Sequence, residues 1–207
     1  MNYLAHLFLS PRSTHAVVGN LMGDFRRHVR NNALPTEVLQ GIENHCRVDR
    51  FTDSHVGIRG LKHVFSSKRR RYAGIILDVV FDHYLSRHWH TFRDEPRVDY
   101  IGYLYGCLQR GRGLMPPRMQ TVVAYMIEED WLGSYVDLAG IDTCLNRMSH
   151  RIRFDNNLYG AIEEVQANYN ELEAGFLEFF PQLMEHINQL SGDSSLNYRV
   201  NKCNQSG

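Results

Sequence analysis

An apolar run in the middle of the chain, residues 75–85, is the feature that most restricts the possible folds. It is long enough for about three helical turns and is hydrophobic almost all round, which is typical of a helix at the centre of a fold. Two carboxylates, Asp78 and Asp82, interrupt it. Burying an unpaired carboxylate is very costly, so such groups are normally paired, hydrogen-bonded or bound to a metal. The run therefore predicts a central helix that carries polar chemistry into the core.

Apolar residues elsewhere recur mainly at helical spacing, and clean strand alternation is scarce. We predict an all-α protein with one compact multi-helix domain over residues 1–190. The segment 191–207 turns polar and loses periodicity, so it is predicted to be a disordered tail. The expected helices cover about residues 2–9, 13–30, 35–54, 57–65, 70–92, 98–109, 117–131, 138–148 and 158–185.

Composition narrows the class of protein. The formal net charge of +0 gives no overall bias towards nucleic acid or membrane, and no stretch approaches transmembrane length. The apolar start, residues 1–9, lacks the charged segment of a signal peptide. The 4 cysteines are far apart and form no CxxC pair, which favours a reducing compartment. We therefore expect a cytoplasmic protein that binds neither nucleic acid nor membrane.

The predicted helix at 35–54 carries a histidine and an acid on its apolar face. His45 and Asp49 are four positions apart and share this face with Val38 and Ile42. This spacing can place two ligands on one ion, or a ligand and the residue that orients it. The alternative is a buried histidine–aspartate hydrogen bond that only fixes the helix.

The central run repeats the same spacing with two acids. Asp78 and Asp82 point the same way, and they repel unless a cation or a shared proton lies between them. Pairing with Arg47 or Arg87 is the structural alternative. Asp24 lies at the edge of the apolar face of the helix at 13–30. Oxygen and nitrogen ligands without thiolates favour Mn, with Mg or Fe as alternatives, over a structural zinc.

Several other chemistries lack their sequence signatures. The chain has neither the GxGxxG nor the GxxxxGK[ST] pattern of nucleotide-binding loops, and it has no GxSxG nucleophile elbow. The paired Glu-x-x-His motifs of di-iron bundles are also absent from the sequence. A metal-centred hydrolytic site is the interpretation that remains best supported by the residues.

Four segments resemble the acyl carrier protein phosphodiesterase family: residues 1–7, 19–25, 41–53 and 77–89. The similarity extends over about residues 1–185. It implies a helical fold distantly related to the HD-type metal phosphohydrolases, dependence on Mn, and removal of 4'-phosphopantetheine from holo-acyl carrier protein. Standard HD proteins carry adjacent histidine and aspartate in that order, whereas Asp82-His83 reverses it. Ligands are therefore assigned from helix geometry.

The resulting hypothesis is one metal, or two, held by acids and a histidine from separate helices. Asp49 is either a ligand or the group that orients His45. Arg47 would stabilise charge on phosphate oxygens, and His6 or His83 would act as general acid. The predicted metal ligands are Asp24, His45, Asp49, Asp78 and Asp82.

An acidic carrier protein needs a basic docking surface. The first candidate is the run Lys68, Arg69, Arg70 and Arg71, and the second is Arg147, Arg151 and Arg153. Either cluster could instead be a solvated face. Two other functions stay open: an HD-like phosphohydrolase of a nucleotide or small phosphate ester, and a non-enzymatic helical interaction module with internally paired acids.

Overall fold

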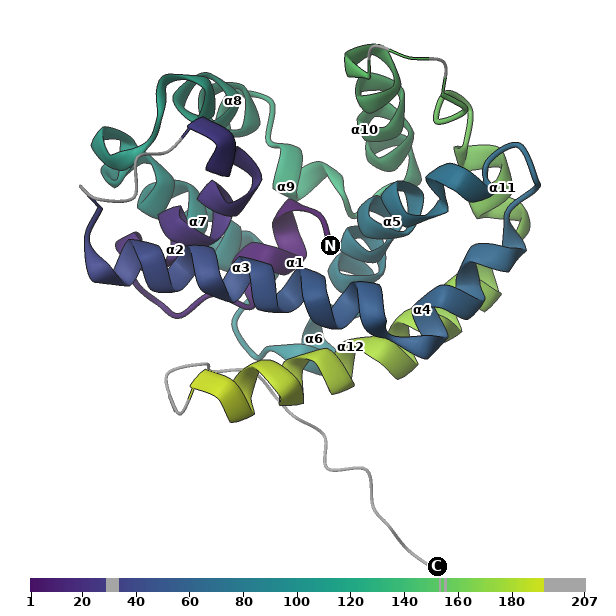
Figure 1. Ribbon diagram of the computed structural model, residues 1–207, viewed down its shortest axis with the longest axis horizontal. Coiled ribbons are helices and arrows are strands. Elements are labelled where there is room, and N and C mark those ends of the chain that lie inside the picture. The colour runs from purple at the N-terminus through teal and green to yellow at the C-terminus, as the bar shows by residue number, and fades with distance from the viewer. Residues whose placement is uncertain (29–33, 153, 155, 192–207) are drawn as a thin grey trace, which may run out of the picture.

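The computed structural model describes residues 1–28, 34–152, 154 and 156–191, and these form a bundle of helices (Figure 1). No strand occurs in these ranges, so the all-α prediction is confirmed for them. The predicted tail lies almost entirely outside the described residues. The α-helices are α1 Tyr3–Phe8, α2 Thr14–Met22, α3 Thr36–Ser54, α4 Val56–Leu61, α5 Ala73–Arg87, α6 Trp89–Phe92, α7 Arg97–Arg110, α8 Pro117–Glu128, α9 Trp131–Ser134, α10 Leu138–Arg151, α11 Ile162–Ala167 and α12 Tyr169–Ser191; 3-10 turns are η1 Gly23–His28, η3 Lys62–Val64, η4 Arg70–Tyr72 and η5 Arg112–Leu114.

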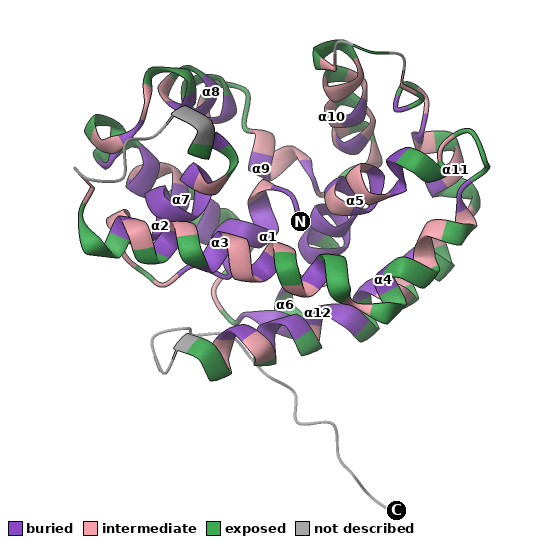
Figure 2. Ribbon diagram, viewed as in Figure 1, coloured by how far each residue is buried: buried purple, intermediate pink, exposed green. Residues whose placement is uncertain are grey.

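Helix α5 is the centre of the fold, as its apolar run predicts. It packs against α1, α10 and α12 and is buried on nearly every side (Figure 2). Ile76, Val79 and Val80 are completely buried. Aromatic side chains of α12 close the core below it: Phe176 contacts Phe81 with ring centroids 5.4 Å apart. In the part of the chain that is described, no helix is long and apolar enough to cross a membrane.

Three predicted helices are interrupted. The one at 70–92 stops at His88, whose φ of −99° and ψ of 22° separate α5 from α6. The one at 117–131 ends at Glu128, because Asp130 takes a left-handed φ of 46° and accepts the Gly133 N–H as the cap of α9. The one at 158–185 is divided at Asn168 between α11 and α12. Apolar periodicity continues across each break, so the pattern alone does not reveal them.

Glycines allow α2 and α3 to cross at close range. A Cβ on Gly19 would lie 2.2 Å from the Val38 carbonyl oxygen, and one on Gly41 would lie 2.6 Å from the Ala16 carbonyl oxygen. These obstacles are backbone atoms, which cannot move aside as a side chain can. The crossing holds α3 against α2 and thereby fixes the helix that carries His45 and Asp49.

The expected result of Gly19→Ala is a loss of about 1–3 kcal/mol in the free energy of unfolding, because the helices must separate. Gly102→Ala is the matched control: Gly102 lies in α7 with no atom within 4 Å of an added Cβ. That variant should gain roughly 0.5–1 kcal/mol from reduced backbone entropy. Urea unfolding of both variants measures the difference. Equal stability changes would contradict the close crossing.

Candidate active site

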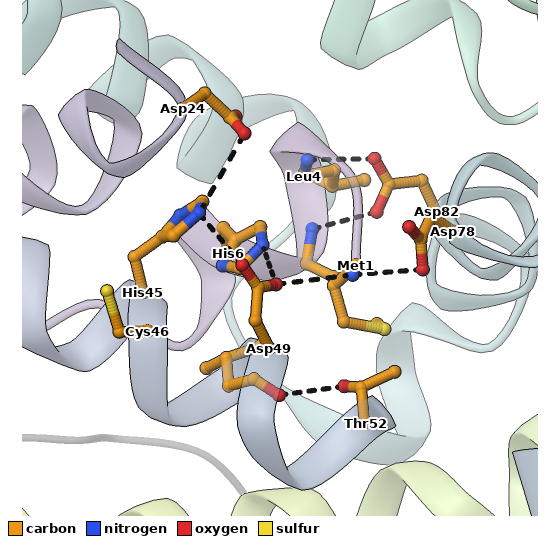
Figure 3. A network of polar contacts seen from close by, with 12 residues as sticks. Met1, Leu4, His6, Asp24, His45, Cys46, Asp49, Thr52, Asp78 and Asp82 are labelled. Carbon is orange, nitrogen blue, oxygen red and sulfur yellow. Dashed lines mark hydrogen bonds and ion pairs between the residues drawn. The ribbon is translucent and has the colours of Figure 1, made fainter. Parts of the chain in front are cut away.

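Two histidines and one aspartate meet where α1 crosses α3 (Figure 3). The His6 and His45 rings stack with centroids 3.8 Å apart and planes 15° apart. His6 Nε2 lies 3.1 Å from Asp49 Oδ1, and His45 Nε2 lies 3.1 Å from Asp49 Oδ2. Both rings are buried, whereas the Asp49 side chain is 42% exposed. The carboxylate thus joins two buried imidazoles at the solvent edge.

The donor set of this cluster fits a divalent cation. His6, His45 and Asp49 each offer one ligand atom, and these atoms lie within 4.8 Å of one another. Burial lowers the pKa of His6 to about 3, so its imidazole is neutral near pH 7. The Nδ1 atoms of both rings are buried and have no hydrogen-bond partner among the described residues. Neutral imidazole nitrogens beside a carboxylate are ligands suited to Mn or Fe.

Two more acids border the cluster. Asp24 Oδ1 lies 3.8 Å from His45 Nε2, and the Met1 amino group lies 3.0 Å from Asp78 Oδ1 and 3.6 Å from Asp49 Oδ1. Burial raises the pKa of Asp78 and the nearby amino group opposes this rise. The structure therefore brings four predicted residues together from three separate segments: Asp24, His45, Asp49 and Asp78.

The backbone at Gly23 packs directly on the His45 ring. A Cβ at this position would lie 2.2 Å from His45 Cγ and 2.3 Å from Cδ2. Only a residue without a side chain leaves room for the ring in its observed place. Gly23 opens η1, so this contact also ties Asp24 to His45.

We expect Gly23→Ala to weaken Mn²⁺ binding by about 10–100-fold, the range typical of lost support around a metal ligand. The added methyl group displaces the His45 ring from Asp49. Gly113→Ala is the matched control, because Gly113 also lies in a 3-10 turn and nothing is within 4 Å of its added Cβ. Isothermal titration with Mn²⁺ compares the two. Equal affinities would show that the ring tolerates the methyl group.

Asp82, which was predicted to bind the metal, contacts the backbone at the start of α1. Its two carboxylate oxygens accept the backbone N–H groups of Leu4 and Ala5, both at 2.9 Å (Figure 3). Asp82 is completely buried, and burial raises its pKa to about 7. These are the free amides at the start of α1. Asp82 therefore anchors the helix that carries His6.

His83, predicted as a general acid, and Arg47, predicted to stabilise phosphate oxygens, have other partners in the structure. His83 Nδ1 lies 3.0 Å from the Tyr135 carbonyl oxygen and Nε2 lies 2.9 Å from the Tyr169 hydroxyl, so α5 directs its ring away from Asp78. Arg47 pairs with Glu43 one turn earlier, with Nε 3.4 Å from Oε1. No contact in the described structure joins either residue to the cluster.

The basic run is only partly free to bind a partner. Arg69 donates to Glu164 at 2.7 Å and to the carbonyl oxygens of Asn157 and Tyr159. Arg70 donates to the Phe65 carbonyl oxygen. Arg69 thus fixes a loop and the start of α11. The exposed members of the run are Lys68, Arg70 and Arg71; in the second cluster Arg147 pairs with Glu129, Arg151 is exposed, and Arg153 lies outside the described residues.

Comparison with known proteins gives the cluster a context. The family model for acyl carrier protein phosphodiesterase matches residues 1–183. The chain belongs to the acyl carrier protein phosphodiesterase family. The member of that name from Serratia proteamaculans is 37% identical over 188 residues, covering 89% of this chain and 96% of that protein. Those from Pectobacterium atrosepticum and Escherichia coli O9:H4 are 34% and 35% identical, with the same coverage. No solved structure matches the chain.

Within this acyl carrier protein phosphodiesterase family member, His6 is the residue whose place the sequence indicated least. It was predicted as a general acid, with His83 as the alternative, and the structure puts its ring on His45 and within reach of Asp49. A lone histidine in a short apolar helix is ordinarily a core or boundary residue. Its presence in the first resembling segment, residues 1–7, is the signal that pointed to the site.

Proposed function

We propose that this chain is a metal-dependent phosphodiesterase that removes 4'-phosphopantetheine from holo-acyl carrier protein. The observation that carries the proposal is the cluster of His6, His45 and Asp49 in a chain whose relatives bear the name acyl carrier protein phosphodiesterase. In the reaction, water adds to phosphorus and the bond from phosphorus to the serine oxygen breaks. The serine oxygen takes a proton, which leaves apo-acyl carrier protein and free 4'-phosphopantetheine.

Mn is the proposed metal, with Mg or Fe as alternatives. His6, His45 and Asp49 would hold it, and Asp24 and Asp78 lie beside them. When bound, the ion would polarise the phosphoryl oxygens and lower the pKa of water. Distant kinship with the HD-type phosphohydrolases belongs to the proposal and is supported by the arrangement of histidine and aspartate on crossing helices.

The chain's own residues organise this chemistry. Asp49 orients both imidazoles through its two oxygens. The neutral His6 ring is poorly suited to donate a proton near pH 7, since burial lowers its pKa to about 3. The remaining acids at the same edge are Asp24 and Asp78, and we assign the proton for the departing serine oxygen to this pair.

We place the reaction in the cytoplasm. The described cysteines Cys46, Cys107 and Cys144 are free thiols, which persist in a reducing compartment. The carrier protein that holds the substrate would dock through the exposed basic residues Lys68 and Arg71, or through Arg151 at the second cluster. Lys68, Arg71 and Arg151 are exposed, whereas Arg69 is held in an ion pair with Glu164.

Intact mass spectrometry of holo-acyl carrier protein tests the function. Incubation with the protein and Mn²⁺ should remove the mass of the phosphopantetheine group, and EDTA should prevent this. Retention of the mass by a folded, Mn-loaded protein would overturn the substrate assignment. Cleavage of nucleotides or small phosphate esters in its place would indicate an HD-like phosphohydrolase, and absence of both metal binding and hydrolysis would indicate an interaction module.

A further inference from the structure

The segment 156–160, between α10 and α11, brings the two basic clusters together. On one side the Asn157 side chain donates to the Lys68 carbonyl oxygen at 2.8 Å. On the other side the Gly160 N–H donates to Asn146 Oδ1 in α10 at 3.2 Å. In Figure 1 the start of α11 lies beside the turn that precedes α5. The segment, called loop 156–160 below, is therefore bonded both to the basic run and to the helix that carries the second cluster.

Loop 156–160 holds an aromatic side chain out towards solvent. Tyr159 is 66% exposed, whereas Leu158 before it is completely buried and ties the loop to the core. The Tyr159 carbonyl oxygen accepts Arg69 at 3.2 Å, and the Tyr159 ring lies beside the His150 ring with centroids 6.4 Å apart. These contacts fix the backbone and leave the tyrosine ring open. A tyrosine presented in this way is a frequent anchor in protein–protein interfaces, because little conformational freedom is lost on binding.

The exposed charges on both sides of the loop are positive. Lys68 and Arg71 are exposed on one side, and Arg151 is exposed on the other. Glu164, the acid that contacts the basic run, is paired with Arg69 at 2.7 Å and so does not offset them. The whole chain has a formal net charge of +0, so this concentration of positive charge is local. Basic residues around an exposed aromatic ring favour an acidic protein as the partner.

Both sides of this surface lead to the metal-binding cluster. Arg71 lies just before α5, and Asp78, which borders the cluster, follows it by seven residues, or about 10 Å along the helix. Arg151 is within electrostatic reach of the Tyr3 hydroxyl, and His6 follows Tyr3 by one helical turn. A protein bound to loop 156–160 would therefore lie beside the cluster.

We propose that loop 156–160 and the exposed basic residues on its two sides form one docking surface for the acidic carrier protein, with Tyr159 as the apolar anchor. The proposal rests on the function proposed above, and it replaces the choice between two basic clusters with one surface that contains both. The bond to be cleaved joins phosphorus to a serine of the carrier. The carrier itself must therefore contact the chain close to the cluster, as this surface allows.

Charge reversal on each side of the loop tests the basic part of the surface. Arg71→Glu and Arg151→Glu should each weaken binding of fluorescein-labelled apo-acyl carrier protein at least about fivefold at low salt. The two effects should multiply in the double variant and shrink as salt is added. Arg112→Glu is the matched control, because Arg112 is exposed in η5, between α7 and α8. Fluorescence anisotropy with the Mn-loaded protein measures all four affinities.

Tyr159→Ala tests the apolar anchor. We expect the affinity for the same probe to fall at least about tenfold, the loss typical of a tyrosine that anchors an interface. Tyr125→Ala is the matched control, because Tyr125 is 52% exposed on α8. The KM for holo-acyl carrier protein should rise in parallel in Tyr159→Ala and kcat should stay unchanged. Mn²⁺ affinity and thermal stability should match those of the control.

The outcomes separate the docking surface from the proposed function. Carrier affinities equal to those of the controls would overturn the surface, while release of phosphopantetheine by the wild-type chain would keep the function. A loss confined to one of the two basic clusters would overturn the single surface, as would a wild-type chain that does not bind the carrier. If the wild-type chain binds the carrier with the expected pattern but releases no phosphopantetheine, the proposed function fails and the surface is supported.

Discussion

Asp49→Asn should reduce the release of phosphopantetheine by at least about a hundredfold, beyond the range for residues that only support a metal ligand. Among the described residues, Asp49 is the one whose two oxygens reach both imidazoles, each at 3.1 Å. Asparagine offers one oxygen and turns an NH₂ group towards the other ring. It also removes the negative charge that a divalent cation requires. The change would therefore affect the proposed metal binding and the orientation of both imidazoles together.

The folded state should survive this substitution. The Asp49 side chain is 42% exposed, and asparagine has nearly the same shape. Asp53→Asn is the matched control, because Asp53 is an exposed acid one turn further along α3 and lies outside the cluster. Mn²⁺ affinity and the rate of mass loss from holo-acyl carrier protein should fall in Asp49→Asn alone. More than a tenth of the wild-type rate in that variant would place the metal elsewhere.

Acidification should destabilise the wild-type chain more than the Asp49→Asn variant. Burial would raise the pKa of Asp49, but hydrogen bonds from His45 and His6 outweigh it and hold the pKa below its usual value. An acid whose pKa is depressed in the folded state contributes stability above its unfolded pKa and loses it as the pH falls. We therefore expect the wild-type chain without metal to lose stability below about pH 4 more steeply than Asp49→Asn. Thermal unfolding from pH 7 to pH 3 measures this, and parallel curves would contradict it.

The sequence predicts the geometry within one helix well, but it predicts contacts between helices far apart in the chain poorly. Helix α3 was expected at 35–54 and spans Thr36–Ser54, and its four-residue spacing brings His45 and Asp49 together as expected. Both results depend only on helical periodicity within one segment. The stacking of His6 on His45 depends on how α1 lies across α3, and no periodicity encodes that crossing.

Asp82 illustrates the same limit. The pattern correctly predicted that a carboxylate in residues 75–85 must have partners, but those partners are backbone amides 77 and 78 positions away. Backbone groups leave no signature in a sequence, so a metal was the simpler expectation. The surroundings of His83 were equally hidden in the sequence. This residue follows Asp82 directly in α5, and its ring contacts Tyr135 and Tyr169.

Asp82→Ala should lower the free energy of unfolding by about 2–4 kcal/mol, because two buried N–H groups lose their acceptors. Leu4 and Ala5 are completely buried, so water cannot replace the carboxylate without opening the core. Asp82→Asn keeps one acceptor and should lie between Asp82→Ala and the wild type. Urea unfolding at pH 7 ranks the three proteins. An alanine variant as stable as the wild type would show that α1 needs no anchor.

The pH dependence of the wild type distinguishes this anchor from an ordinary salt bridge. Burial raises the pKa of Asp82 to about 7, so the folded state retains a proton that the unfolded state releases near pH 4. Stability then falls as the pH rises from about 4 to about 7, the reverse of the Asp49 effect. Asp82→Asn, which does not titrate, should remove this part of the pH profile. Because α1 also carries His6, Asp82→Ala should weaken Mn²⁺ binding even under conditions where the chain remains folded, and unchanged Mn²⁺ affinity would uncouple the anchor from the site.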